Sequence, residues 1–144
     1  MTTALAVLAA ATFCWLGMVL AISFLEAPLK FRAPGVTVPI GLGIGRLVFR
    51  ALNIAELVLA ATILAAILVD SPGAAATRTL TVAMVVFAAQ VAVVRPRLTR
   101  RSDAVLAGAD VPRSHSHFAY IALEVVKVLA LLVGGILALA HSMP

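Results

Sequence analysis

Residues 118–140 read FAYIALEVVKVLALLVGGILALA, an apolar run whose only charged residues are Glu124 and Lys127. A helix needs about 20 mostly apolar residues to cross the ~30 Å hydrocarbon core of a lipid bilayer. This run is long enough, and it therefore predicts a transmembrane helix.

Three more apolar runs precede this one. The predicted spans are residues 4–25, 47–69, 78–95 and 117–140. No Lys or Arg precedes the first run, which is also longer than the core of a signal peptide, so we expect it to be a retained span. Asp70-Ser71-Pro72-Gly73 is a turn signal between the second and third runs. The predicted fold is all-α, a polytopic membrane protein whose four-transmembrane-helix bundle forms one domain over residues 1–144.

The composition supports the same class of protein. Of 144 residues, 63% are hydrophobic and 12% are charged, and the mean hydropathy is +1.14. Soluble domains carry about 25% charged residues, so an ordinary soluble enzyme, a disordered tail and a secreted disulfide scaffold are excluded. The single cysteine, Cys14, lies inside the first run and is interpreted as a small residue facing lipid or a helix.

The connections differ from one another in character. Residues 33–45 are apolar but contain two prolines and four glycines, which argues against a regular helix there and favours an irregular interfacial segment. Residues 97–116 are the longest polar stretch and are predicted to be a loop. The GLGIG sequence at 41–45 follows no strand and lacks a Walker lysine, so a phosphate-binding loop is not favoured.

Basic residues predict the orientation of the bundle. Only Arg78 lies in the second connection, whereas nine basic residues flank the first and third. These nine are Lys30, Arg32, Arg46, Arg50, Arg95, Arg97, Arg100, Arg101 and Arg113. By the positive-inside rule, the first and third connections face the cytoplasm and both termini face outward, in an inner (plasma) membrane. The net charge of +5 thus reflects topology, and the expected partner is the lipid bilayer, not nucleic acid.

Polar residues within the spans are the candidate functional residues, because ionisable groups in a bilayer are costly and usually face the bundle interior. In the second and fourth spans they recur every three or four residues, so each set lies on one helix face. The predicted intramembrane polar cluster comprises Glu26, Arg50, Asn53, Glu56, Gln90, His117, Tyr120, Glu124 and Lys127.

The polar faces of the second and fourth spans each carry a charged residue at the same expected depth in the bilayer. Glu56 lies ten residues beyond Arg46, and Lys127 lies ten beyond His117. At ~1.5 Å per residue, both are roughly 15 Å from the cytoplasmic boundary and close to the bilayer midplane. We therefore expect Lys127 to lie against Glu56, with Glu124 as its second partner. The outer half of the bundle is almost wholly aliphatic.

Two interpretations of the cluster remain open. It forms either a buried ion-pair network that fixes helix register, or a pocket open to the cytoplasm that binds a solute or passes protons. Two deep carboxylates sharing one lysine favour a working site. The aliphatic outer half argues against a monomeric channel and favours an accessory or oligomeric role.

The chain contains no recognisable nucleophile, metal site or nucleotide motif. His115 and His117 alternate, but no third ligand accompanies them at metal-binding spacing, so neither metal nor haem is expected and no cofactor is assigned. The prediction is a non-enzymatic protein, either an accessory subunit of a membrane complex or a small-solute or proton-coupled carrier. Small residues predict a homo-oligomer or packing against partner helices. They are Ala60-Ala61, Ala65-Ala66, Gly134-Gly135 and Ala138.

Several short motifs resemble a family of small four-span proteins of unknown function, typified by the transmembrane protein associated with cisplatin resistance. They are Phe31-Arg32-Ala33-Pro34 after the first span, the basic-aromatic start of the second span at Arg46 to Phe49, Pro96-Arg97, and His117 at the start of the fourth span. Tyr120 and Glu124 depart from the Ser and Asn of that pattern. The resemblance implies a membrane protein with an export or trafficking role.

A second set of residues is similar to the membrane-associated eicosanoid and glutathione metabolism proteins, which are four-span enzymes. Arg50-Ala51-Leu52-Asn53-Ile54-Ala55-Glu56 keeps their Asn-x-x-Glu pattern but is one residue short between Ala51 and Asn53. The deletion rotates Arg50 by about 100° relative to Asn53 on a helix. The alternative function implied by this resemblance is a glutathione-dependent membrane enzyme.

Overall fold

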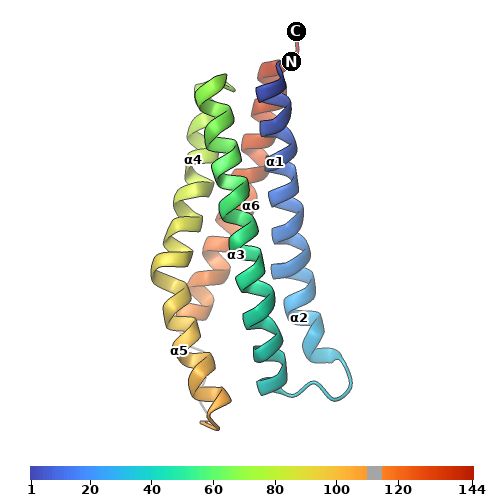
Figure 1. The fold of residues 1–144 in the computed structure, drawn as a ribbon, viewed down its shortest axis with the longest axis vertical. Helices are drawn as coiled ribbons and strands as arrows, with labels where there is room; N and C mark the ends of the chain where they lie inside the picture. Colours follow the sequence, from blue (N-terminus) through green and yellow to red (C-terminus); the bar gives the residue numbers. More distant parts are fainter. Residues whose placement is uncertain (110–114) are drawn as a thin grey trace.

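The computed structural model describes residues 1–109 and 115–144, which form helices and turns without any strand. Four long helices stand side by side and make a bundle (Figure 1). Each is long and apolar enough to cross a membrane, and they cover Thr3–Arg32, Val38–Val69, Ala74–Leu106 and His117–Ser142. The protein is therefore a small multi-pass integral membrane protein, and the predicted all-α four-helix fold is confirmed.

The first and third helices each contain a π-helical segment. The first runs through α1 (Thr3–Val19), η1 (Leu20–Glu26), α2 (Ala27–Leu29) and η2 (Lys30–Arg32), and the third through α4 (Ala74–Ala89), η3 (Gln90–Val94) and α5 (Arg95–Leu106). The π-helical segments η1 and η3 end two residues before Pro28 and Pro96, respectively. Proline lacks an N–H and its ring clashes with the preceding helical turn. A wider π turn relieves this conflict and lets the helix continue.

The second helix, α3 (Val38–Val69), begins nine residues earlier than the predicted span, so the expectation of an irregular segment over residues 33–45 is wrong from residue 38 onward. Thr37 caps the helix by accepting a hydrogen bond from the Ile40 N–H at 3.4 Å, and Pro39 lies in the first turn, where its missing N–H is harmless. Gly41 and Gly45 are close-packing positions, because a Cβ there would meet the Phe31 ring and the Lys30 ammonium.

The polar stretch predicted as a loop over residues 97–116 is also largely helical. Its first ten residues belong to α5, which ends at Leu106 before a turn with Gly108 at φ +93°. Arg, Leu and Ala are good helix formers, and the preceding π segment accommodates Pro96. The charges of this stretch thus lie on an extension of the third helix. Residues 110–114 of the predicted loop lie outside the described residues.

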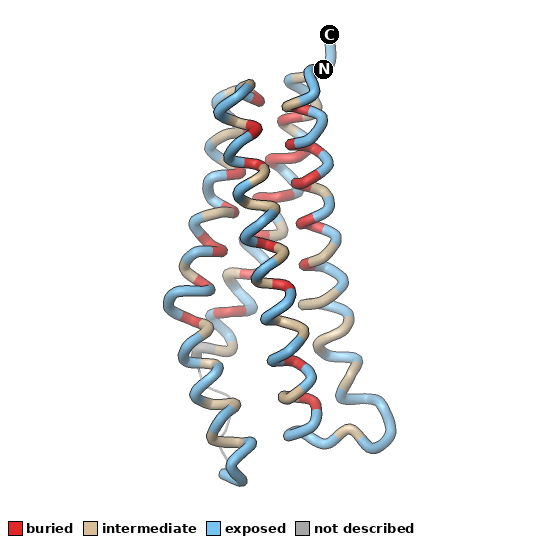
Figure 2. Tube along the Cα trace, in the orientation of Figure 1, coloured by how far each residue is buried: buried red, intermediate tan, exposed pale blue. Residues whose placement is uncertain are grey.

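The helices pack in a defined order around α6 (His115–Ser142), which lies against both α1 and α4, while α1 also packs along α3. Contacts between α3 and α4 are few. Buried residues follow the inner faces of the helices (Figure 2). In lipid, such packing rests on van der Waals contact and small residues rather than on hydrophobic exclusion of water. Accordingly, a Cβ on Gly134 would meet Leu80 and one on Gly135 would meet Phe13, so both glycines serve packing inside the bundle.

The two ends of the bundle differ in charge. Both chain termini lie at one end, here called the terminal end (Figure 1). The opposite end, here called the basic end, carries the connection before α3 and the arginine-rich α5. Toward the terminal end the interior is filled by apolar side chains that are almost completely buried. They include Leu8, Ile63, Ala76, Leu80, Leu131 and Ala138.

Candidate functional site

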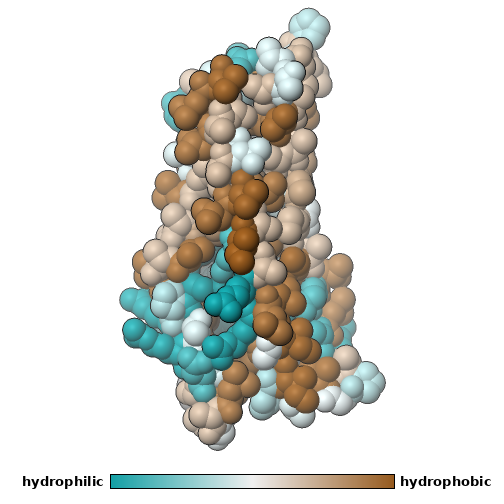
Figure 3. Space-filling view, in the orientation of Figure 1, coloured by the Kyte–Doolittle hydropathy of each residue, from teal (hydrophilic) through white to brown (hydrophobic). Residues whose placement is uncertain are grey.

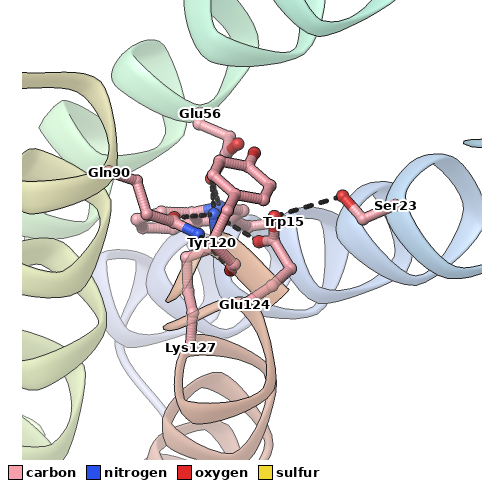
Figure 4. A network of polar contacts seen from close by, with 7 residues as sticks. All are labelled: Trp15, Ser23, Glu56, Gln90, Tyr120, Glu124 and Lys127. Carbon is pink, nitrogen blue, oxygen red and sulfur yellow. Dashed lines mark hydrogen bonds and ion pairs between the residues drawn. The ribbon is translucent and has the colours of Figure 1, made fainter. Parts of the chain in front are cut away.

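The ammonium group of Lys127 occupies the centre of the bundle, and its side chain is 0% exposed. Its Nζ atom lies 2.5 Å from Glu56 Oε2 on α3 and 2.6 Å from Glu124 Oε1 on its own helix. It also donates to Gln90 Oε1 at 2.8 Å (Figure 4). The contacts with Glu56 and Gln90 are hydrogen bonds, whereas the contact with Glu124 Oε1 is an ion pair without hydrogen-bond geometry. The contacts expected with Glu56 and Glu124 from shared depth are confirmed.

Hydrogen bonds connect this centre to the remaining helix. The indole Nε1 of Trp15, on α1, donates to Glu56 Oε2 at 2.8 Å, and Ser23 Oγ donates to Glu124 Oε2 at 3.2 Å (Figure 4). Side chains from all four membrane-spanning helices thus meet at one point. We call the group Trp15, Ser23, Glu56, Gln90, Glu124 and Lys127 the ion-pair centre.

The π-helical segments position two members of the ion-pair centre. Ser23 lies within η1, and Gln90 is the first residue of η3. The extra residue in a π turn shifts the side chains that follow it around the helix, and such turns are frequent at functional sites. Gln90 is consequently buried at 2% exposure, and its Nε2 also donates to the Tyr120 backbone carbonyl at 3.4 Å. The sequence signal for both segments is the proline that follows them.

Charge within the centre is unequal, with two carboxylates around one ammonium. Glu56 Oε2 accepts from both Lys127 and Trp15, whereas Glu56 Oε1 is buried without a hydrogen-bond partner among the described residues. Removing one partner of a buried pair typically costs about 3–5 kcal/mol, because the other charge stays uncompensated. The centre is therefore a strong constraint on how the helices dock.

A second cation lies on the basic-end side of the centre. The Arg95 guanidinium carbon is 4.6 Å from the Phe49 ring centroid and 5.5 Å from that of Tyr120. The two rings are themselves edge-to-face, with centroids 6.0 Å apart. These distances are in the range of cation–π attraction. Arg95 was not among the predicted cluster residues, because its position at the end of a span indicated only topology.

The other predicted cluster residues lie outside the centre. Glu26 is paired with Lys30 at 3.7 Å, one turn along the same helix, and His117 packs edge-on against Phe118. Arg50 is exposed and Asn53 half-buried, and the described part of the chain shows no side-chain hydrogen bond or ion pair to either. Of the nine, Glu56, Gln90, Glu124 and Lys127 meet in the ion-pair centre, and Tyr120 adjoins it through its backbone carbonyl, which accepts from Gln90. Sequence reasoning missed Trp15, Ser23 and Arg95.

Metal ligands do not gather in this part of the molecule. Within residues 1–109 and 115–144, no three His, Cys, Asp or Glu side chains are placed to hold a metal ion. Cys14 is exposed on the bundle surface. The chemistry available at the centre is thus that of a lysine, two carboxylates and their hydrogen-bond partners.

The fold and the site define a multi-pass membrane protein whose four spans meet at a buried ion-pair centre. No family model matches the chain, and no curated protein or solved structure is detectably similar to it. Its function is accordingly argued from the site.

Proposed function

We propose that the protein is a non-enzymatic accessory subunit of a larger membrane complex, with its basic end facing the cytoplasm. The observation that supports this proposal most directly is that the partners of Lys127 in the ion-pair centre are other side chains of the bundle. The Lys127 ammonium donates to Glu56 and Gln90 and is paired with Glu124, so all three of these partners lie within the protein, and they come from three helices. Such an arrangement favours a fixed scaffold over a site that opens during transport.

The terminal half of the bundle supports the same proposal. A carrier or channel needs polar groups or water along its path. Between the ion-pair centre and the terminal end, the interior is packed with aliphatic side chains such as Leu8, Ile63 and Leu131, each 0% exposed. A path through the single bundle would require these side chains to separate and the ion pairs to break.

The glutathione-enzyme alternative receives less support. The Asn-x-x-Glu pattern would have to present Asn53 and Glu56 to a ligand, but Glu56 is 1% exposed and already accepts from Lys127 and Trp15. Arg50, the cation of that pattern, is exposed on the surface of α3. Glu56 thus faces the bundle interior, whereas Arg50 lies on its surface.

The test is the mass of the intact protein, released from its native membrane into nanodiscs without detergent exchange. We expect a defined assembly larger than one chain, with a second protein in fixed stoichiometry. A mass that is a multiple of this chain alone would instead identify a homo-oligomer. A monomer with nothing bound, together with solute-dependent or proton-dependent flux in proteoliposomes, would overturn the proposal in favour of a carrier.

A further inference from the structure

Arg95 lies against two aromatic rings, and none of its hydrogen-bond donors is used within the described residues. A guanidinium presents five N–H donors. The Phe49 and Tyr120 rings contact its cationic face. Among residues 1–109 and 115–144, no acceptor lies within hydrogen-bonding distance of it and no carboxylate forms an ion pair with it. The guanidinium can therefore donate to an acceptor that the described chain does not supply.

The charges around Arg95 favour an anion. Arg50 directly follows Phe49 on α3 and is exposed. One turn before Arg50, Arg46 is neutralised by Asp103 of α5 at 2.6 Å. This ion pair holds α3 and α5 together at the basic end. Among the described residues, neither Arg50 nor Arg95 has a carboxylate at ion-pair distance, although Glu124 and Glu56 attract Arg95 from further away.

The surface beside these residues lies between two helices that pack loosely on each other. The helices α3 and α4 make few contacts, whereas each packs closely on another neighbour. On the face shown in Figure 3, hydrophilic side chains gather around a hollow near α5, below a band of apolar groups. Ile54 and Leu57 lie on the same face of α3 as Arg50, one and two turns along, and are 61% and 62% exposed. A polar recess thus adjoins an apolar surface. A lipid has the matching layout, because its polar headgroup is joined to apolar acyl chains.

We propose that Arg95 binds the phosphate-bearing headgroup of an anionic membrane lipid between α3 and the third helix, on the terminal-end side of the Arg46–Asp103 pair. The planar fork of an arginine matches phosphate oxygens in a bidentate manner. Basic pockets between transmembrane helices are known to hold anionic headgroups. The acyl chains lie along the exposed apolar face of α3. A lipid is favoured over a soluble phosphate because the recess continues into this apolar surface.

The test uses the full chain, purified and delipidated in mild detergent, and titrated with phosphatidylglycerol, phosphatidylcholine or inorganic phosphate. Bound lipid is counted by native mass spectrometry, and thermal unfolding is followed in parallel. We expect the protein to retain phosphatidylglycerol and to be stabilised by it, with weaker effects of phosphatidylcholine and none of phosphate. Losing a charge-assisted hydrogen bond in Arg95→Gln should weaken phosphatidylglycerol binding about tenfold.

Two further variants separate the role of the Arg95 guanidinium from a general effect of positive charge. Arg97→Gln removes the same charge from an exposed position of the same helix and should leave binding within about twofold of the native protein. Arg95→Lys keeps the charge and loses the fork, so it should fold and bind less tightly than the native protein. Equal losses in the Arg95→Gln and Arg97→Gln variants, native affinity in Arg95→Lys, or no preference for phosphatidylglycerol over phosphatidylcholine would overturn the proposal. Stabilisation by inorganic phosphate alone would identify a soluble-anion site instead.

Discussion

Lys127 and Glu56, 71 positions apart in the chain, form an ion pair with 2.5 Å between Nζ and Oε2, and both side chains are essentially inaccessible to solvent. An unpaired lysine near the bilayer centre is unfavourable by about 2.5–3.5 kcal/mol on insertion scales. The pair therefore couples the docking of α3 and α6 to the burial of a charge. It also explains why both residues lie at the same depth.

Replacing one member of this pair should be worse than replacing both. Lys127→Met leaves two carboxylates uncompensated and should lower the free energy of unfolding by about 3–5 kcal/mol. Adding Glu56→Gln removes one of these charges and keeps an acceptor for the Trp15 indole, so part of the loss should be recovered. The measurement is reversible unfolding in mixed micelles, followed by the fluorescence of Trp15, the single tryptophan.

Val126→Met is the control for this cycle, since Val126 is exposed beside Lys127 and should tolerate the change. If the double variant is as unstable as the sum of the two single variants, the residues do not interact energetically. Restored folding combined with loss of the native assembly would assign the pair to function as well as to stability.

Two glycines of α3 should respond in opposite ways to the same substitution. Gly41→Ala places a Cβ against the Phe31 ring and should destabilise the docking of η2 on α3, whereas a Cβ at Gly43 meets nothing within 4 Å. Gly43→Ala should therefore raise the free energy of unfolding by about 0.5–1 kcal/mol through helix propensity. The difference in melting temperature between the two variants measures the effect. Stabilisation by both substitutions would show that the Phe31 contact is absent.

The topology is testable by labelling single cysteines in intact cells. In a Cys14→Ala background, Thr2→Cys should react with an impermeant thiol reagent, and Thr99→Cys on α5 should be protected until the membrane is opened. The reason is the excess of basic residues at the end that carries α5. Both positions are exposed in the folded protein, so accessibility reports the membrane side. The opposite labelling pattern would reverse the orientation.

Glutathione should not stabilise the purified protein. A ligand at a hundredfold excess over its dissociation constant contributes about 2.7 kcal/mol by mass action. Because Glu56 is occupied by Lys127 and Trp15, we expect no shift in melting temperature with glutathione. A glutathione-specific rise that disappears in Asn53→Ala would place the enzyme alternative first.

The sequence by itself determined the four spans, the placement of both termini at one end and the shared depth of Glu56 and Lys127. These follow from local requirements, because a bilayer demands a certain length of apolar helix and penalises an unpaired charge. The helical content of residues 38–45 and 97–106 was misjudged from the glycines and charges there. Gly41 and Gly45 serve close contact with the first helix, and that contact is a property of two segments together.

Only the tertiary structure decided which side chains complete the ion-pair centre. A regular helix repeats every 3.6 residues, and counting along it places polar residues on a face. The π-helical segments before Pro28 and Pro96 interrupt that count, and they shift Ser23 and Gln90 to positions where they reach Glu124 and Lys127. Trp15 reads in sequence as one more apolar residue of a span, and its indole N–H acquires a role only when α1 packs beside Glu56. The rotation of each helix about its axis is set by packing against its neighbours, and that information is not local to any one span.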